Sequence, residues 1–307
     1  MRPAAPGDSA ALLEGVVLSP RHGLAYVMRP GGGLAAVNLA SGKVQWRSDK
    51  AARPLALVGD RLIAQAESQG GRALHLVALD ARSGAARDSV RIPLPEGVVA
   101  SVVDTPASSF RVRADTAASD LVVSWESTGM VAQGYLPADE EGQAPGGEPT
   151  FIAGQTVLDL ASPSLTVKAE PTVRLADSAA LTRASLEELA APAVKGVEGR
   201  QLLSADGRHV LVTEPVDKAD FTLYRHRWTL YERSSGARLG SVPSMVSATP
   251  FVVVGTTVYH TVPAHAIRQN GKFVENPAVL HAVNLKTGAE MWKMAVRETA
   301  FRGPFAP

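Results

Sequence analysis

Residues 36–46 read AVNLASGKVQW, and residues 282–292 read AVNLKTGAEMW. Both strings open with Ala-Val-Asn-Leu, carry a glycine at the same place (Gly42 and Gly288) and end on a tryptophan (Trp46 and Trp292). Because identical spacing over such a string is typical of a repeated structural unit, the chain is expected to be built from repeats.

Three further strings follow this pattern between the two ends. They read LVALDARSGAARD (76–88), TVLDLASPSLTV (156–167) and TLYERSSGARLG (229–240), with expected turns at Gly84, Pro163 and Gly236. Apolar residues alternate before the turn, as in a half-buried strand, and Ser41-Gly42 supplies the positive φ that a tight turn needs. Each string is therefore predicted to form a β-hairpin.

A second hairpin is predicted upstream of several of these strings. Strands flank a polar or glycine-containing turn in VVLSPRHGLAYVM (16–28), LALVGDRLIAQ (55–65), LLSADGRHVLV (202–212) and PFVVVGTTVYHT (250–261). Two hairpins in series make a four-stranded antiparallel meander. Repetition of this unit predicts an all-β propeller, a closed ring of roughly five to seven blades with six plausible, in which each sheet buries both faces.

The composition limits the class of protein. Of 307 residues 45% are hydrophobic, and 31 basic side chains stand against 30 acidic ones, for a formal net charge of +1. This balance gives no electrostatic reason to expect nucleic acid or an anionic membrane as the main partner. The chain has no cysteine, which excludes disulfides, thiolate nucleophiles and zinc–thiolate sites.

Two features of the sequence bear on membrane association, the apolar runs and the N-terminal residues. The apolar run at residues 251–254 is far too short to span a bilayer. The opening MRPAAPGDSAALLEG has no apolar stretch of signal-peptide length, yet it is also typical of a mature domain after a linker, so a trimmed signal or lipid anchor stays open. We expect a flexible segment over residues 1–11 and one propeller domain over 12–307.

The string A-V-N-L-x-[ST]-G-x-x-x-W, preceded by V-V-x-G-[DT]-x-[VL]-[YI], resembles the blade repeat of the quinoprotein-like (PQQ-like) β-propeller family. Members of that family include PQQ-dependent dehydrogenases and the outer-membrane assembly lipoprotein BamB. In the family the tryptophan docks onto the adjacent blade, which is the role that the resemblance implies for Trp46 and Trp292. The motif is architectural, so it is informative about the fold and weak for function.

Three insertions widen the spacing of the repeats. Residues 129–154, rich in Gly, Pro and acidic side chains, are expected to form a long loop, and residues 263–278 a longer last unit with a hairpin tip at Gln269-Asn270-Gly271. Residues 173–199 are expected to hold a short helix, because residues 185–188 fit a capping box and Pro192 ends the run. In an alternative interpretation, Ser127-Thr128-Gly129 is a turn of a degenerate sixth blade.

Long loops on a rigid scaffold are where binding usually takes place. The candidate partner-binding residues within the insertions are Tyr135, Glu140, Glu141, Leu186, Leu189 and Phe273. The helix either packs on the side of the propeller or docks a partner.

Catalysis has less support in the residues. PQQ-dependent alcohol dehydrogenases, which share the repeat, also use an adjacent Cys-Cys pair, a calcium ion and an Asp base, and this chain has no cysteine and no convincing calcium constellation. His260, His265 and His281 match no standard metal motif, so His260 is expected to end a strand, His265 to lie in a loop and His281 to lie in a strand.

The run Tyr224-Arg225-His226-Arg227-Trp228 is locally basic and aromatic, as in nucleic-acid-binding segments. In a strand, however, its aromatic and histidine side chains would face one side and its arginines the other. A packed face opposite a solvated face is therefore expected.

These features favour a non-catalytic propeller scaffold that binds protein partners, with no cofactor, as a subunit of a bacterial envelope assembly. The expected location is the periplasm or the cell envelope, with the cytoplasm as the alternative. Two other functions stay open: a propeller enzyme, either a hydrolase, a lyase or a quinone-dependent oxidoreductase, and a propeller that binds a small ligand in its central channel.

Overall fold

The computed structural model describes residues 9–13, 15–67, 72–104, 108–117, 119–130, 149–162, 164–176, 189, 193–217, 225–269 and 272–297. Within these ranges all regular structure is β-strand, as the sequence predicts. The described residues contain no helix, and so none that could cross a membrane.

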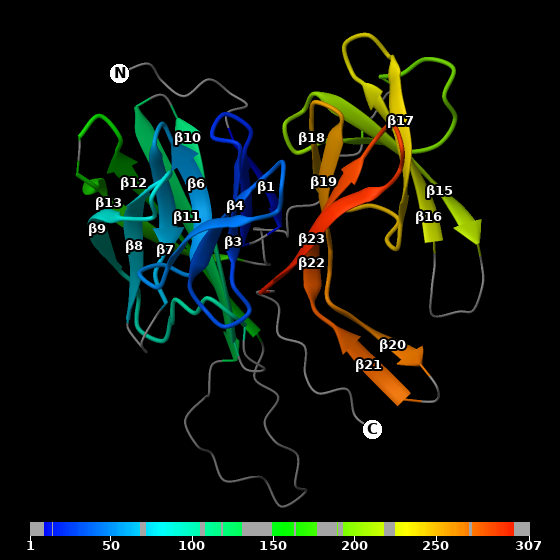
Figure 1. The fold of residues 1–307 in the computed structure, drawn as a ribbon. Helices are drawn as coiled ribbons and strands as arrows, with labels where there is room; N and C mark the ends of the chain where they lie inside the picture. The colour runs from blue at the N-terminus through cyan, green and yellow to red at the C-terminus, as the bar shows by residue number, and fades with distance from the viewer. Residues whose placement is uncertain are drawn as a thin grey trace, which may run out of the picture.

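The strands form five antiparallel sheets of sequential strands, which we call blades 1 to 5 (Figure 1). Blade 1 holds β1 (Ala10–Leu13), β2 (Val16–Ser19), β3 (Leu24–Met28), β4 (Leu34–Asn38) and β5 (Val44–Ser48). Blade 2 holds β6 (Arg53–Val58), β7 (Arg61–Gln65), β8 (Ala73–Asp80) and β9 (Ala86–Pro93). Blade 3 holds β10 (Ser108–Ala117), β11 (Asp120–Met130), β12 (Pro149–Asp159) and β13 (Thr166–Ala176).

Blades 4 and 5 complete the set. Blade 4 holds β14 (Gln201–Leu203), β15 (His209–Asp217), β16 (Arg225–Glu232) and β17 (Arg238–Ser244). Blade 5 holds β18 (Phe251–Val254), β19 (Thr257–Val262), β22 (Ala278–Asn284) and β23 (Glu290–Val296). A separate two-stranded sheet, β20 (His265–Gln269) and β21 (Lys272–Asn276), is inserted between β19 and β22.

Both kinds of expected hairpin are confirmed. Each AVNL-type string is the hairpin of the last two strands in a blade, and each upstream string is the hairpin of two earlier strands. The turn glycines have the positive φ expected of them, 68° at Gly42 and 69° at Gly288. Asn38 strengthens its turn by accepting hydrogen bonds at Oδ1 from the backbone N–H and hydroxyl of Ser41, both at 3.0 Å.

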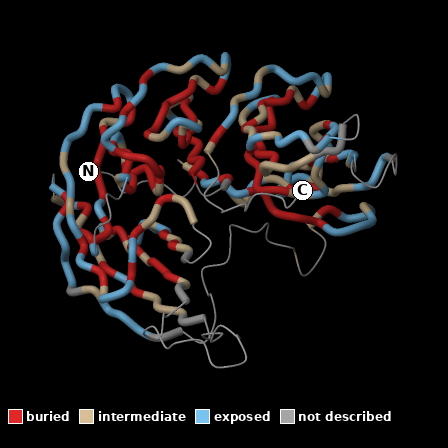
Figure 2. The backbone as a smooth tube through the Cα atoms, turned by 90° about the horizontal axis from the view of Figure 1, so that it is seen from below, coloured by how far each residue is buried: buried red, intermediate tan, exposed pale blue. Residues whose placement is uncertain are grey.

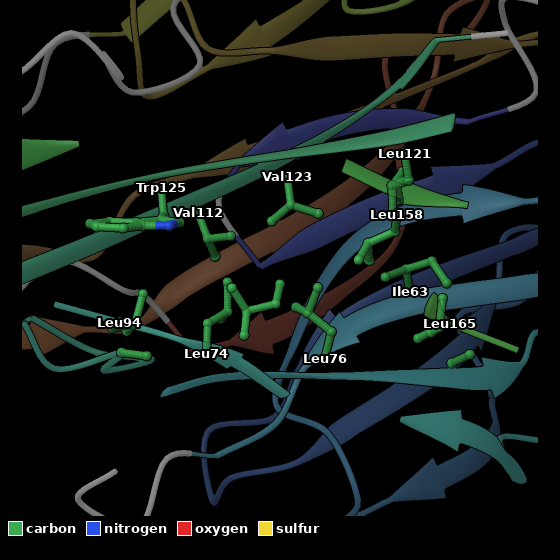
Figure 3. Close-up of a cluster of buried hydrophobic side chains, with 14 of the residues drawn as sticks. Ile63, Leu74, Leu76, Leu94, Val112, Leu121, Val123, Trp125, Leu158 and Leu165 are labelled. Atoms are coloured by element: carbon green, nitrogen blue, oxygen red, sulfur yellow. The ribbon is translucent and has the colours of Figure 1, made fainter. Parts of the chain in front are cut away.

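Four clusters of buried apolar side chains join the blades in pairs. They lie between blades 2 and 3, 1 and 2, 5 and 1, and 4 and 5. Figure 3 shows the first, in which Leu74 of blade 2 meets Val123 and Trp125 of blade 3. None of these clusters combines blade 3 with blade 4 in the part of the chain that the structure describes.

The blades therefore follow the spatial order 3, 2, 1, 5, 4 along an arc (Figure 2). The first and last blades in the chain, blades 1 and 5, lie side by side at its middle. Most of the connection from blade 3 to blade 4, residues 177–188 and 190–192, lies outside the described residues. Closure into a ring stays a prediction.

Several expected boundaries are wrong. Residues 127–129 lie inside β11 and pair with both β10 and β12, so they are no turn and start no sixth blade. The expected loop 129–154 overlaps β11 and β12, because the two strands are extended by pairing that continues to Met130 and Pro149. Residues 131–148 lie outside the described residues.

The other insertions and the N-terminus differ in detail. Residues 173–176 belong to β13, and residues 181–188 of the expected helix lie outside the described residues, as do Asn270 and Gly271. Gln269 pairs with Lys272, so a two-residue connection joins β20 to β21, as the hairpin prediction requires. β1 begins at Ala10, inside the segment expected to be flexible, because Ala10 pairs with Leu18 and Leu12 is wholly buried.

Gly154 allows the tight packing of blade 3. A Cβ on this residue would lie 2.2 Å from the ring of Trp125, whose side chain is wholly buried and cannot retreat. Gly154→Ala is expected to lower the free energy of unfolding by about 3 kcal/mol. Gly31→Ala, at a site with no atom within 4 Å, is the matched control and should change it by less than about 0.5 kcal/mol. Urea unfolding measures both, and equal stability of the two variants would contradict the packing described.

Candidate functional site

Blade 5 docks onto blade 1 through two donors that share one carbonyl. Trp292 Nε1 donates to the Leu39 carbonyl at 2.8 Å, and the Tyr259 hydroxyl donates to the same oxygen at 3.0 Å. The indole lies over Gly42, where a Cβ would come within 2.7 Å of the ring. The tryptophan thus has the docking role that the family resemblance implied.

The same arrangement recurs where blade 1 meets blade 2. Trp46 Nε1 and the Tyr26 hydroxyl donate to the Ala81 carbonyl at 3.1 and 3.2 Å. The Trp46 ring lies over Gly84, the counterpart of Gly42. Burial, followed by the charge of Asp80, raises the pKa of Tyr26, so its hydroxyl keeps the proton that it donates.

The junctions of blades 2 and 3 and of blades 4 and 5 also form at this turn, but without a tryptophan. From blade 2, Arg61 donates to the carbonyls of Leu160 and Ser162 in blade 3, at 2.9 and 3.0 Å. Between blades 4 and 5 the position of the tryptophan is Gly240, and a Cβ there would lie 2.0 Å from the Leu285 carbonyl oxygen. Close approach of the backbones replaces the indole at this junction.

Sequence reasoning missed the tyrosines and Arg61. A signal for the tyrosines was present, because each lies three residues after the turn of its upstream hairpin, in HGLAY and GTTVY. Arg61 has no counterpart in the other blades, so nothing in the repeat indicated its role.

The expected partner-binding residues are only partly placed. Tyr135, Glu140, Glu141 and Leu186 lie outside the described residues. The backbone N–H of Leu189 donates to the Gln201 carbonyl at 3.0 Å, beside the first strand of blade 4. Phe273 lies in β21, opposite Arg268. These last two positions belong to different blades and are not brought together.

The β20–β21 hairpin extends away from blade 5 (Figure 1). It leaves the blade after Val262 and returns at Ala278, with five residue pairs from His265–Asn276 to Gln269–Lys272. Val274 is one of the exposed large apolar side chains, at 38%. His265 was expected in a loop but begins β20, where its Nδ1 lies 3.0 Å from the Pro263 carbonyl oxygen.

A buried histidine pair lies at the junction of blades 4 and 5. His260 in β19 is directly opposite His281 in β22, and their rings stack with centroids 5.3 Å apart. The other neighbour of His260 is Trp228 of blade 4, at 4.8 Å. Both histidines lie in strands, as the sequence predicts. No group of three His, Asp or Glu side chains arranged to hold a metal ion occurs among the described residues.

Burial lowers the pKa of both histidines. Desolvation, with the charge of His281 as the second cause, lowers the pKa of His260 to about 3. Burial also lowers the pKa of His281, against the opposing effect of Glu290, whose Oε2 lies 2.9 Å from His281 Nδ1. His260 is only 2% exposed, and its Nδ1 has no hydrogen-bond partner.

The basic and aromatic run in blade 4 is a strand with two different faces. Trp228 is wholly buried, and Arg225 and Arg227 are exposed, as expected for a packed face opposite a solvated one. Arg227 forms an ion pair with Glu214 at 3.1 Å. Tyr224 lies outside the described residues.

A double-mutant cycle tests the shared carbonyl. Tyr26→Phe and Trp46→Phe each leave one donor on the Ala81 oxygen, so each should lower the free energy of unfolding by about 1 kcal/mol. The double variant leaves this buried carbonyl without either donor and should lose about 1 kcal/mol more than the sum of the single changes. Chemical unfolding of the four proteins gives the coupling energy, and additivity within error would contradict the shared acceptor.

Acid should weaken the junction of blades 4 and 5. The pKa of His260 is lower in the folded than in the unfolded chain, so the unfolded state binds more protons between about pH 3 and 6.5, and stability falls as pH falls through this range. From pH 7 to 5 this group should lower the free energy of unfolding by about 2 kcal/mol. His260→Gln should remove that part of the pH dependence in urea unfolding at the two pH values. An unchanged pH dependence would show that folding does not lower the pKa of His260.

Comparison with known proteins adds a family. Residues 6–134 match the family model described as outer membrane protein assembly factor BamB. No curated protein matches the chain. Similar solved structures include a europium-containing methanol dehydrogenase (11% identity, 95% of this chain, 70% of that chain, TM-score 0.28).

Two other solved structures are similar at the same level. One is the quinohemoprotein alcohol dehydrogenase from Comamonas testosteroni, at 11% identity over 94% of this chain and 43% of that chain, with TM-score 0.31. The other is the Cps50 (Swd1) β-propeller domain of Myceliophteria thermophila, at 12% identity over 96% and 99%, with TM-score 0.25. These likenesses are too distant to bear on function. The family match covers residues 6–134 of 307, and within this stretch Trp46 docks blade 1 onto blade 2 as the resemblance to the PQQ-like β-propeller family implied.

Proposed function

We propose that this protein is a non-catalytic propeller scaffold that binds other proteins in a bacterial envelope assembly, in the periplasm or at the envelope. The observation that carries the proposal is the β20–β21 hairpin, which interrupts blade 5 and extends away from it with Val274 exposed (Figure 1). The match of residues 6–134 to an outer-membrane assembly factor supports the location.

The blade contacts support a scaffold role. The tryptophans and tyrosines of the repeat donate to backbone carbonyls of the next blade, so these side chains join blades and leave the loops to meet a partner. The hairpin can present Val274 because blade 5 keeps continuous β19–β22 pairing, from Thr257–Asn284 to Val262–Val279, beside the insertion.

A hairpin that binds a partner should cross-link to it. A photo-reactive amino acid in place of Val274, in cells that express the chain, is expected to yield an adduct with one defined protein that fractionates with the envelope. The matched control is Val99, which is 45% exposed in the connection between β9 and β10. It should give no such adduct.

The substitution Val274→Glu should abolish recovery of that protein, because a charge on a buried apolar contact is costly. Val99→Glu should leave recovery unchanged, and both variants should fold because both side chains are exposed. Adducts from neither position, equal adducts from both, or recovery of the chain in the cytosol alone would contradict the proposal.

A further inference from the structure

The turn between the last two strands of a blade faces the blade that comes before it in the chain, and for blade 1 it faces the last blade, blade 5. Gly42 of blade 1 is covered by Trp292 of blade 5, and Gly84 of blade 2 by Trp46 of blade 1. Gly288 of blade 5 faces blade 4, with the Ser241 carbonyl oxygen 3.6 Å from the place of a Cβ. In each of these junctions the neighbouring blade packs on this turn, which we call the receiving turn.

Blade 4 has the same receiving turn, and among the described residues no core cluster places blade 3 against blade 4. Its backbone bond from Gly236 N–H to the Glu232 carbonyl, 2.8 Å, equals the bond from Gly42 N–H to the Asn38 carbonyl. A Cβ added to Gly236 would lie 3.7 Å from Val194 Cγ1, its nearest neighbour. Val194 belongs to the connection from blade 3 to blade 4, so the chain covers this turn with its own linker.

We call residues 193–197 the strap. Val194 is 4% exposed, although the flanking residues at 195 and 196 are exposed. One side chain of blade 4 holds the strap: Gln201 Oε1 accepts from the Val194 N–H at 3.0 Å, and its Nε2 donates to the Val194 carbonyl at 2.9 Å and to the Val197 carbonyl at 3.3 Å. The strap is therefore attached by few contacts, whereas a docked blade is attached by a whole sheet face.

The surface around this turn differs in charge from the other receiving turns. The residue after the turn-opening Asn or Asp is apolar and buried in the other blades, as Leu39 and Ala81 are. In blade 4 it is Arg233, which is exposed. Arg208 and Arg238 are exposed nearby, since Arg233 N–H donates to the Arg208 carbonyl and Arg238 lies across from Tyr231. Three exposed arginines, which we call the arginine rim, thus lie around this turn, together with the exposed Glu232 that opens it.

We propose that the Gly236 turn is a docking site for a partner's β-strand segment that carries a tryptophan flanked by acidic residues. In the free protein Val194 occupies the position that this tryptophan would take. The indole would lie over Gly236 and donate to the Arg233 carbonyl, as Trp46 and Trp292 do at the equivalent turns, while the acidic flanks meet the arginine rim. This inference rests on the proposed protein-binding function and names a second contact surface for it.

Opening of the strap can be measured without a partner, because the chain has no cysteine and Val194→Cys supplies a single thiol. In this background Gln201→Ala should raise the rate of thiol labelling about tenfold, since it removes the side chain that holds the strap. The matched control is Gln155→Ala, an exposed glutamine in β12 of blade 3, which should leave the rate unchanged.

Docking is tested with a synthetic peptide of residues 282–296, whose Trp292 makes the equivalent contact on blade 1, with its lysines replaced by glutamate. Gln201→Ala should bind the peptide about tenfold more tightly than the parent chain, by the same factor that opens the strap. The same peptide with the tryptophan replaced by alanine should not bind. Val194→Ser, which removes the buried side chain and leaves blade 4 intact, is the second variant if Gln201→Ala does not fold.

An unchanged labelling rate in Gln201→Ala would contradict the claim that Gln201 holds the strap in place. Faster labelling with no gain in peptide affinity, or equal binding of the alanine peptide, would overturn the docking site. These failures are separate from failure of the proposed function, because cross-linking through Val274 uses another blade and does not depend on the strap.

Discussion

The carbonyl of Leu39 is the point on which the arrangement of this protein depends. Trp292 and Tyr259 both donate to it, and through it the last blade of the chain is attached to the first. The surrounding cluster, which includes Leu12, Val37 and Leu280, is apolar and buried. Because blades 3 and 4 share no core cluster among the described residues, this contact joins the two arms of the arc and connects residues far apart in the sequence.

The other junctions are variations on this contact. Blade 1 repeats it on Ala81, Arg61 replaces the aromatic donors on Leu160, and Gly240 lets the backbone of blade 5 approach without any side chain. At blade 4 the receiving turn is kept, but a valine from the linker covers it. The series runs from a full aromatic contact to a small local cover, which lies at the junction where the described residues leave the arc open.

The fold could be predicted from the sequence because its repeat is local. Gly42, Gly288 and the flanking alternation of apolar residues specify hairpins within about a dozen residues. The lengths of β11 and β12 could not be predicted, since their extension rests on pairing between Met130 and Pro149 across a long connection. The role of Tyr259 could not be predicted either, because its hydrogen-bond partner, the Leu39 carbonyl, lies 220 residues away in the sequence.

The candidate binding surfaces were harder to predict than the blades, because they are departures from the repeat. The hairpin tip at residues 269–272 followed from a turn signal, whereas Gln201 and Val194 carry no motif and acquire their role from one set of backbone hydrogen bonds. Both surfaces lie in the arm formed by blades 4 and 5.

Cutting the connection between blades 3 and 4 tests most directly whether blade 5 is attached to blade 1. A protease site placed between residues 176 and 193 would separate blades 1 to 3 from blades 4 and 5 without touching a blade. After cleavage the two fragments should elute together, held by the contacts of Trp292 and Tyr259 with blade 1, and should separate when both aromatic residues are replaced by alanine. Fragments that separate in the parent protein, or that stay together in the double variant, would contradict the attachment of the last blade to the first.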